Sequence, residues 1–424
     1  TQFMVDGVPI STDANLQYSP LSDTQSSVSS SSTENNRNIT NKGVDMRSIS
    51  TDDIETVEVV RGIPSVEYGN LTSGMVNIKK IRRAIPWTAR FKADGYSKLF
   101  SIGKGLAFGV SGKSILNVDL GYMDSKIDPT DNFESYKRVT GSVRYTYRKE
   151  QDKHRTLQWN SSFDYSGSFD NSKTDPDINY GRVDEYKSSY SRMAFSNSLN
   201  IRMPKSWFKE FDVNTSLSLQ LDRLRQTRLE APQRYGIVPL SWTDGENEAQ
   251  AVYAEYMANY LCDGKPFTAY VKAKGVMGFK ALGTDNKVKV GLNWDLAKNF
   301  GDGQVYDMHR PLSLTGWSSR PRKYSDIPAL QNLSFFVEEL MKWKWGQNKF
   351  ELMAGVRLNT MPGLDDKYDM SGKVYADPRG NLAWHFPKFN VGGKPMAISL
   401  NGGIGITTKM PTLNYLYPDK YYSN

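Results

Sequence analysis

The chain has 424 residues, of which 38% are hydrophobic, and a formal net charge of +8. No apolar run approaches the roughly 18 residues that a membrane helix requires, which excludes a helical membrane protein. A transmembrane barrel is not excluded, because its strands alternate two differently solvated faces and are only half hydrophobic. Cys262 is the only cysteine, so an internal disulfide and a cysteine-rich metal site are ruled out.

Residues 1–80 are expected to form a small α+β domain. Val5-Asp6-Gly7-Val8 predicts two short strands joined by an Asp-Gly turn. A Ser/Asn-rich stretch at 19–40 is too polar to pack and is expected to be an exposed loop. Residues 54–60 predict a further strand, and glycines punctuate the segment from Val66 to Ile78. Because the chain opens directly on a strand-like segment, we expect the true N-terminus to precede it.

Residues 81–424 alternate apolar and polar side chains with a period of two, which is typical of strands. Val290, Leu292 and Trp294 share one face of their strand, whereas Lys289 and Asn293 share the other. The same pattern recurs at 138–147 and at 350–359. It predicts about thirteen strands of roughly 9 to 11 residues, the length that crosses an outer membrane at a tilt. We expect the apolar faces to meet lipid and the polar faces to meet the lumen.

The connections between these strands alternate in length, which favours an outer-membrane barrel. Short connections are expected at 149–155, 204–211, 283–286, 346–349 and 387–395. Long connections are expected at 125–135, 171–188, 229–266, 300–332 and 361–373. Only the first hairpin, near Gly95, departs from this alternation.

The sequence resembles the TonB-dependent receptor family through three ordered motifs. These are VDGVP at 5–9, DIETVEVVRGIPSVEYG at 53–69 and GMVNI at 74–78. The resemblance places the plug motif on Asp6, Gly7, Glu55, Glu58, Arg61, Gly62, Tyr68, Gly69 and Gly74. It also implies an ionic contact between Arg61 and the barrel, for which Glu338 is the candidate partner.

The resemblance implies an all-β transmembrane barrel with a small α+β plug domain. Residues 1–80 would be the C-terminal part of the plug, and residues 81–424 a partial barrel. About thirteen strands of about 22 would be present, because large transporters of this kind enclose a plugged lumen with about 22 strands. The family's TonB box, the first half of its plug and its last strands have no counterpart here. The Ser-rich insertion and the Asp52-Asp53 entry to the motif suggest a Bacteroidetes-type member.

As a family member, the chain would be an outer-membrane receptor and not an enzyme. It would import a ferric siderophore, haem or cobalamin under the force of TonB, which would contact a segment absent from this chain. No cofactor, no metal site and no nucleic-acid partner is expected. Aromatic and cationic residues of the two longest loops are the candidate ligand contacts: Tyr235, Trp242, Arg310, Trp317, Arg320, Arg322 and Tyr324.

The sequence leaves two other classes of outer-membrane protein open. A SusC-like importer of glycans or peptides would share the plug and barrel and add a lid lipoprotein. A passive porin or an adhesin would share the barrel without needing the plug motif. An enzyme is disfavoured, because the Ser111-Gly112-Lys113-Ser114 segment has Ala107 where a phosphate-binding loop needs its first glycine.

Overall fold

The computed structural model describes residues 2–16, 44, 49–71, 74–109, 112–126, 128–151, 155–175, 177, 180–231, 237–311, 320–391, 394–418 and 420. Nearly all regular structure in these residues is β-strand, arranged in one large sheet and three small ones. Among the described helices, none has the length and apolarity to cross a membrane.

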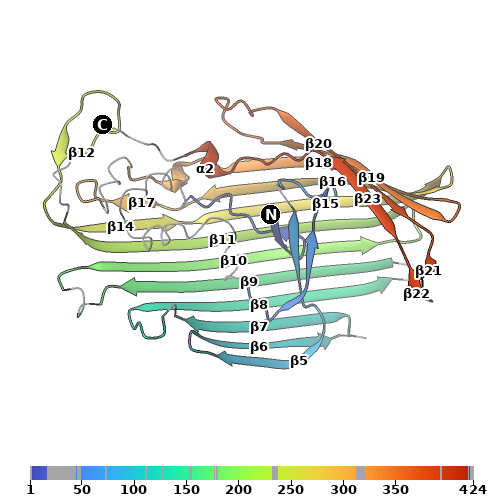
Figure 1. Cartoon of the computed structure of the whole chain (residues 1–424), viewed down its shortest axis with the longest axis horizontal. Helices are drawn as coiled ribbons and strands as arrows, with labels where there is room; N and C mark the ends of the chain where they lie inside the picture. The colour runs from blue at the N-terminus through green and yellow to red at the C-terminus, as the bar shows by residue number, and fades with distance from the viewer. Residues whose placement is uncertain are drawn as a thin grey trace.

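The large sheet has 15 strands, and its main path is an antiparallel meander in which neighbours in sequence are neighbours in space. Figure 1 shows these long strands running side by side. The path consists of β5 (Ile85–Ala93), β6 (Ser97–Phe108), β7 (Ser114–Ser125), β8 (Glu134–Gln151), β9 (Arg155–Lys173), β10 (Asp184–Arg202), β11 (Phe208–Glu230), β15 (Pro266–Ala281), β16 (Thr284–Asn299), β18 (Leu330–Trp345), β19 (Asn348–Thr360), β20 (Val374–His385) and β23 (Ser399–Gly405). Off this path, β14 (Tyr256–Gly264) continues the line of β15 along β11 and pairs with β17 (Gly303–Tyr306).

Most of these strands are longer than the sequence predicted. The expectation of roughly 9 to 11 residues was wrong for β8, which has 18 residues, and for β11, which has 23. The hydrophobic pattern marks only the part of a strand that needs an apolar surface. Backbone pairing continues past it, because the largely polar residues 222–230 of β11 still form a regular ladder with residues 256–264.

Short and long connections lie at opposite ends of the large sheet. At one end, β15 and β16 are joined by Leu282 and Gly283, whose φ angles of 48° and 77° are those of a tight hairpin turn. At the other end lie the long connections at 231–255 and 300–329. Figure 1 places them to the left and the short hairpins of β18–β19 and β21–β22 to the right. The strand β21 (Phe389–Val391) and the strand β22 (Lys394–Met396) form a small hairpin within one short-end connection.

The N-terminal segment (residues 2–80) forms a four-stranded sheet in the order β2-β1-β4-β3. Its strands are β1 (Gln2–Val5), β2 (Val8–Pro9), β3 (Ile54–Val60) and β4 (Met75–Lys80). Asp6 and Gly7 turn the chain with φ angles of 49° and 82°, which confirms the predicted hairpin. The described part of this segment contains no helix, so the helical part of the expected α+β domain is not found there. The predicted loop at 19–40 lies outside the described residues.

The large sheet buries its polar face and exposes its apolar face. On β8, the side chain of Arg144 is fully buried, whereas Val143 next to it is 43% exposed. On β16, Asn293 is 7% exposed and Leu292 is 45% exposed. We call the buried face the inner face; it meets the N-terminal segment, drawn in blue across the long strands in Figure 1. This polarity is the reverse of that expected for a sheet surrounded by water.

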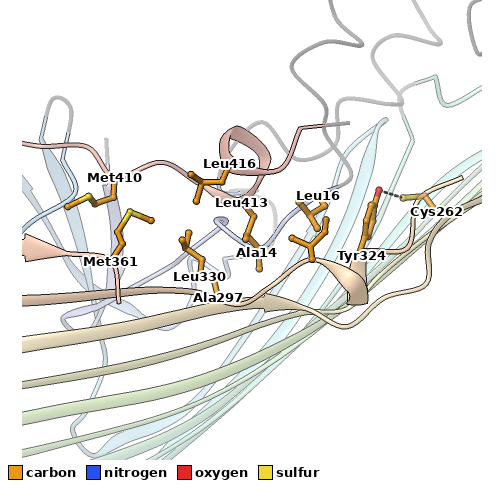
Figure 2. Packing of buried hydrophobic residues seen from close by; sticks show 11 residues of the cluster. Ala14, Leu16, Cys262, Ala297, Tyr324, Leu330, Met361, Met410, Leu413 and Leu416 are labelled. Atoms are coloured by element: carbon orange, nitrogen blue, oxygen red, sulfur yellow. Dashed lines mark hydrogen bonds between the residues drawn. The ribbon is translucent and has the colours of Figure 1, made fainter. Parts of the chain in front are cut away.

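An apolar cluster gathers at the long-loop end, over the inner face (Figure 2). It joins Ala14 and Leu16 of the N-terminal segment to Tyr324 and to the short helix α2 (Leu413–Leu416). Cys262 lies in the same cluster, with its Sγ 3.4 Å from the Tyr324 hydroxyl. The cluster therefore fastens the loops and the segment that follows β23 into one packed unit.

Candidate functional site

The N-terminal segment and the inner face meet through buried charges, and the strongest cluster surrounds Glu67. Its carboxylate lies 2.8 Å from Lys272 Nζ, 3.1 Å from Lys274 Nζ and 3.2 Å from Lys289 Nζ. Burial alone would raise the pKa of Glu67, but the three ammonium groups outweigh it and lower that pKa far below its usual range. Glu67 is therefore ionised and tied to β15 and β16.

Glu338 of β18 completes this contact but does not pair with Arg61. The Glu338 carboxylate accepts a hydrogen bond from the Val66 backbone N–H (2.9 Å) and pairs with Lys289 (2.9 Å). Arg61 is exposed and forms no ion pair with any residue that the structure describes. The expected Arg61–Glu338 contact was wrong, because the arginine follows the exposed edge strand β3 and its side chain does not meet the sheet. The ionic contact exists with its charges reversed, an acid on the segment and cations on the sheet.

Two arginines of the inner face bind the backbone of the same turn. Arg357 Nη1 donates to the carbonyl oxygen of Glu67 (3.1 Å), and Arg379 Nη1 donates to those of Ser65 (3.0 Å) and Tyr68 (2.7 Å). A Cβ atom on Gly69 would lie 2.2 Å from Arg357 Nε. Since Arg357 is buried and bonded on both sides, only glycine fits here.

A second charged network fastens the start of β3 and the end of β4. Lys80 Nζ lies 2.7 Å from Asp53 and 2.7 Å from Asp164 of β9. Arg144 of β8 reaches Asp53 at 3.0 Å and also contacts Asp119 of β7. These residues hold the segment close to the connection that leads into β5.

Most of the remaining residues of the sequence motif organise the segment itself. Asp6 accepts from the Lys80 backbone N–H (3.0 Å) and pairs with Arg82, and the Gly7 N–H donates to the Asn77 side chain. Glu55 and Glu58 form exposed pairs with Arg83 and Lys79. Gly62 has a φ of 80°, and a Cβ on Gly74 would lie 2.7 Å from the Val60 carbonyl oxygen. Tyr68 packs against the cluster of Met4, Leu71 and Met75.

The two longest loops pack against each other, which brings several candidate ligand residues together. Arg310 stacks over the Tyr253 ring at 5.6 Å, and Arg320 donates to the Ser241 carbonyl oxygen (3.0 Å) beside the exposed Trp242. Arg322 donates to the Tyr417 carbonyl oxygen.

Tyr324 is fully buried in the apolar cluster, so it has no surface to offer a solute in this structure. Tyr235 and Trp317 lie outside the described residues.

Sequence reasoning missed the partners of Glu67, although one signal pointed to them. Lys272 and Lys274 occupy alternate positions of β15, so both fall on the inner face, where isolated cations need a buried acid. Asp53 and Glu67 stand inside the motif but outside the set of residues that we singled out.

Among the described residues, two of the cavities lie between the N-terminal segment and the inner face. One has a volume of 570 Å³ and lies toward the long-loop end, where Tyr68, Asn70, Tyr270 and Arg357 line it. The other has a volume of 410 Å³ and lies against β6 to β11. Within the described residues, no three His, Cys, Asp or Glu side chains gather in a way that would hold a metal ion.

No family model and no curated protein matches this sequence. Solved structures with a similar fold include the ferric enterobactin receptor PfeA of Pseudomonas aeruginosa in complex with enterobactin (TM-score 0.54, 13% identity, 97% of this chain and 55% of that chain). Another is FpvA of P. aeruginosa bound to pyoverdines (TM-score 0.53, 11% identity, 91% of this chain and 49% of that chain). The chain spans about half the length of these receptors. At such low identity the likeness establishes the fold alone, a large antiparallel sheet that these proteins share.

Proposed function

We propose that this chain is part of a TonB-dependent outer-membrane receptor, with residues 1–80 in its plug and residues 81–424 in its barrel wall. The observation that carries the proposal is the reversed polarity of the large sheet. An apolar face suits lipid, and a buried polar face suits a plugged lumen. The family motifs at 5–9, 53–69 and 74–78 lie in the segment that the wall faces.

A row of aromatic side chains supports placing one membrane boundary near the short turns. Near the short-turn end of β18 to β20, the rings of Trp343, Phe350, Trp384 and Phe386 stack in series, with centroids 5.3, 5.6 and 4.3 Å apart. The amphipathic rings of Trp343 and Trp384 favour the boundary between lipid and water. We place the short turns in the periplasm and the long loops outside the cell.

The contacts of the plug support movement under force. Those of residues 53–80 include many ion pairs and hydrogen bonds to the wall, such as those of Glu67 and Asp53, whereas Ala14 and Leu16 add apolar contacts at the long-loop end. Water can replace such contacts when they break, whereas separating a large apolar interface would expose it to water. TonB would supply the force.

We propose a small extracellular solute as cargo, of the class that PfeA and FpvA bind, ferric enterobactin and pyoverdine. Trp242 is 54% exposed and Arg310 is exposed, so both can meet a solute arriving at the long loops. Aromatic faces and guanidinium groups suit an anionic, partly planar chelate.

The test is uptake by cells that carry the complete receptor, with ferric enterobactin, haem, cobalamin and oligosaccharides as probes. We expect one probe to bind with or without TonB and to be imported only with TonB. Trp242→Ala should weaken binding of that probe, whereas Trp207→Ala, a change to an exposed tryptophan at the short-turn end, should not. Passage that is independent of TonB would support a porin, and use of oligosaccharides alone would support a SusC-like importer.

A further inference from the structure

The plug is fastened unevenly to the wall. On β15 to β20, large cationic side chains of the wall reach across the boundary between wall and plug and contact residues 64–68. Arg144 of β8 and Asp164 of β9 also reach the plug, at Asp53 and Lys80. On β10 and β11, the inner face carries small hydroxyl side chains beside the two cavities, among them Ser196, Ser216 and Ser218. Such short side chains do not reach from the wall to the plug, so a cavity remains between the plug and these strands.

The two cavities adjoin each other on this side. Both are lined by Pro9 and Ile10 of the plug and by Arg192 and Ser216 of the wall. The larger one opens toward the long loops, and the smaller one extends toward Lys80 and Arg83, near the start of β5. We call these two adjoining cavities beside the plug the passage.

Arg192 lies at the junction with its charge uncompensated. Its Nε donates to Ser218 Oγ (3.1 Å), which orients the guanidinium, and it forms no ion pair within the described part of the chain. The carboxylates that line the smaller cavity are already neutralised, for example Asp164 by Lys80 and Asp52 by Arg90.

We propose that an anionic solute travels along this passage and that Arg192 selects it by binding its carboxylate, phosphate or catecholate oxygens. A guanidinium held by one hydrogen bond keeps its other N–H groups for bidentate contact with such an anion. The neighbouring hydroxyls offer hydrogen bonds without adding charge. This inference rests on the proposed function and names the solute class and the side of the plug that the solute follows.

The test uses charged thiol reagents in place of the unidentified solute. In intact cells carrying the complete receptor with Cys262→Ser, a reporter Ser216→Cys is treated from outside with sulfonatoethyl methanethiosulfonate (anionic) or trimethylammonioethyl methanethiosulfonate (cationic). We express the preference as the ratio of the anionic to the cationic reaction rate, divided by the same ratio at the control Asp244→Cys, because a thiolate by itself favours the cationic reagent. We expect this preference to be about tenfold at Ser216→Cys, as a nearby unpaired charge would cause. Arg192→Gln should abolish the preference, Arg192→Glu should reverse it and Arg192→Lys should keep it. Asp244→Cys, in an exposed loop, is the control whose ratio of rates should not depend on residue 192.

Two outcomes would overturn the proposal. One is a Ser216→Cys reporter that neither reagent modifies while Asp244→Cys reacts, because the passage would then be closed to solutes. The other is a charge preference at Ser216→Cys that is the same with Arg, Gln or Glu at position 192. Because labelling requires neither TonB nor a cognate solute, its result is independent of the uptake experiment.

Discussion

Neutralising Glu67 should loosen the proposed plug (residues 1–80) more than the loss of an exposed charge such as that of Glu58. The Glu67 side chain is 5% exposed and that of Lys272 is 4% exposed, so Glu67→Gln leaves a buried ammonium without its carboxylate. Lys289 keeps Glu338 at 2.9 Å and is less affected. Removing one partner of a buried pair costs about 3–5 kcal/mol. We expect the free energy of opening the plug to fall by that amount.

Hydrogen exchange of the backbone amides of β3 and β4 in the detergent-solubilised receptor measures that opening free energy. Glu58→Gln is the matched control, because its pair with Lys79 is half exposed (3.1 Å) and should contribute about 0–1 kcal/mol. Adding Lys272→Met to Glu67→Gln should recover part of the loss, since the stranded charge is then gone. Equal exchange in the Glu67 and Glu58 variants would refute the view that buried charge holds the plug.

Three further predictions concern the barrel wall, the contact between the plug and the wall, and the effect of pH on plug opening. Leu292→Arg should destabilise the barrel by about 2–4 kcal/mol in urea unfolding from lipid vesicles, and Asn293→Arg much less; equal losses would contradict the assignment of faces. Ile63 and Gly405 lie close together, because a Cβ at Gly405 would be 3.3 Å from Ile63 Cγ2. A disulfide between Ile63→Cys and Gly405→Cys should stop uptake but not binding until a reductant is added. Since folding lowers the pKa of Glu67, its ion pairs contribute fully above the ordinary Glu pKa of about 4.3 and lose their contribution as pH falls below it. Plug opening measured from pH 7 to pH 3 should therefore increase in the native receptor, and a Glu67→Gln variant with the same slope would argue against this cause.

The reversed charge pattern sets this chain apart from the arrangement that its motif implied. The family pattern implied a cation at Arg61 for this contact, whereas in the structure an acid of the N-terminal segment, Glu67, meets cations of the large sheet. Either arrangement gives polar contacts that force can break and water can satisfy. The sign of the charge on each side is therefore free to differ, provided that the buried charges remain paired.

Local patterns determined much of the secondary structure. The Asp6-Gly7 turn follows from turn chemistry, because these residue types tolerate positive φ angles. Alternation along β16 follows from the two-residue period of a strand, which puts Leu292 and Asn293 on opposite faces whatever lies around them. Both features depend on neighbours in sequence, and the sequence alone was sufficient to predict them.

The contacts of the site were decided only by tertiary structure. Glu67 and Lys272 are 205 residues apart, and nothing local to either residue specifies which of several inner-face cations an acid will meet. Arg61 failed as a prediction because its exposure depends on how β3 is placed at the edge of its sheet. Tyr324 was predicted as a ligand contact because it is an aromatic residue in a long loop, but folding of the loops buried it beside Cys262. A sequence pattern specifies the face on which a side chain lies, whereas its partner depends on which distant surface packs against that face.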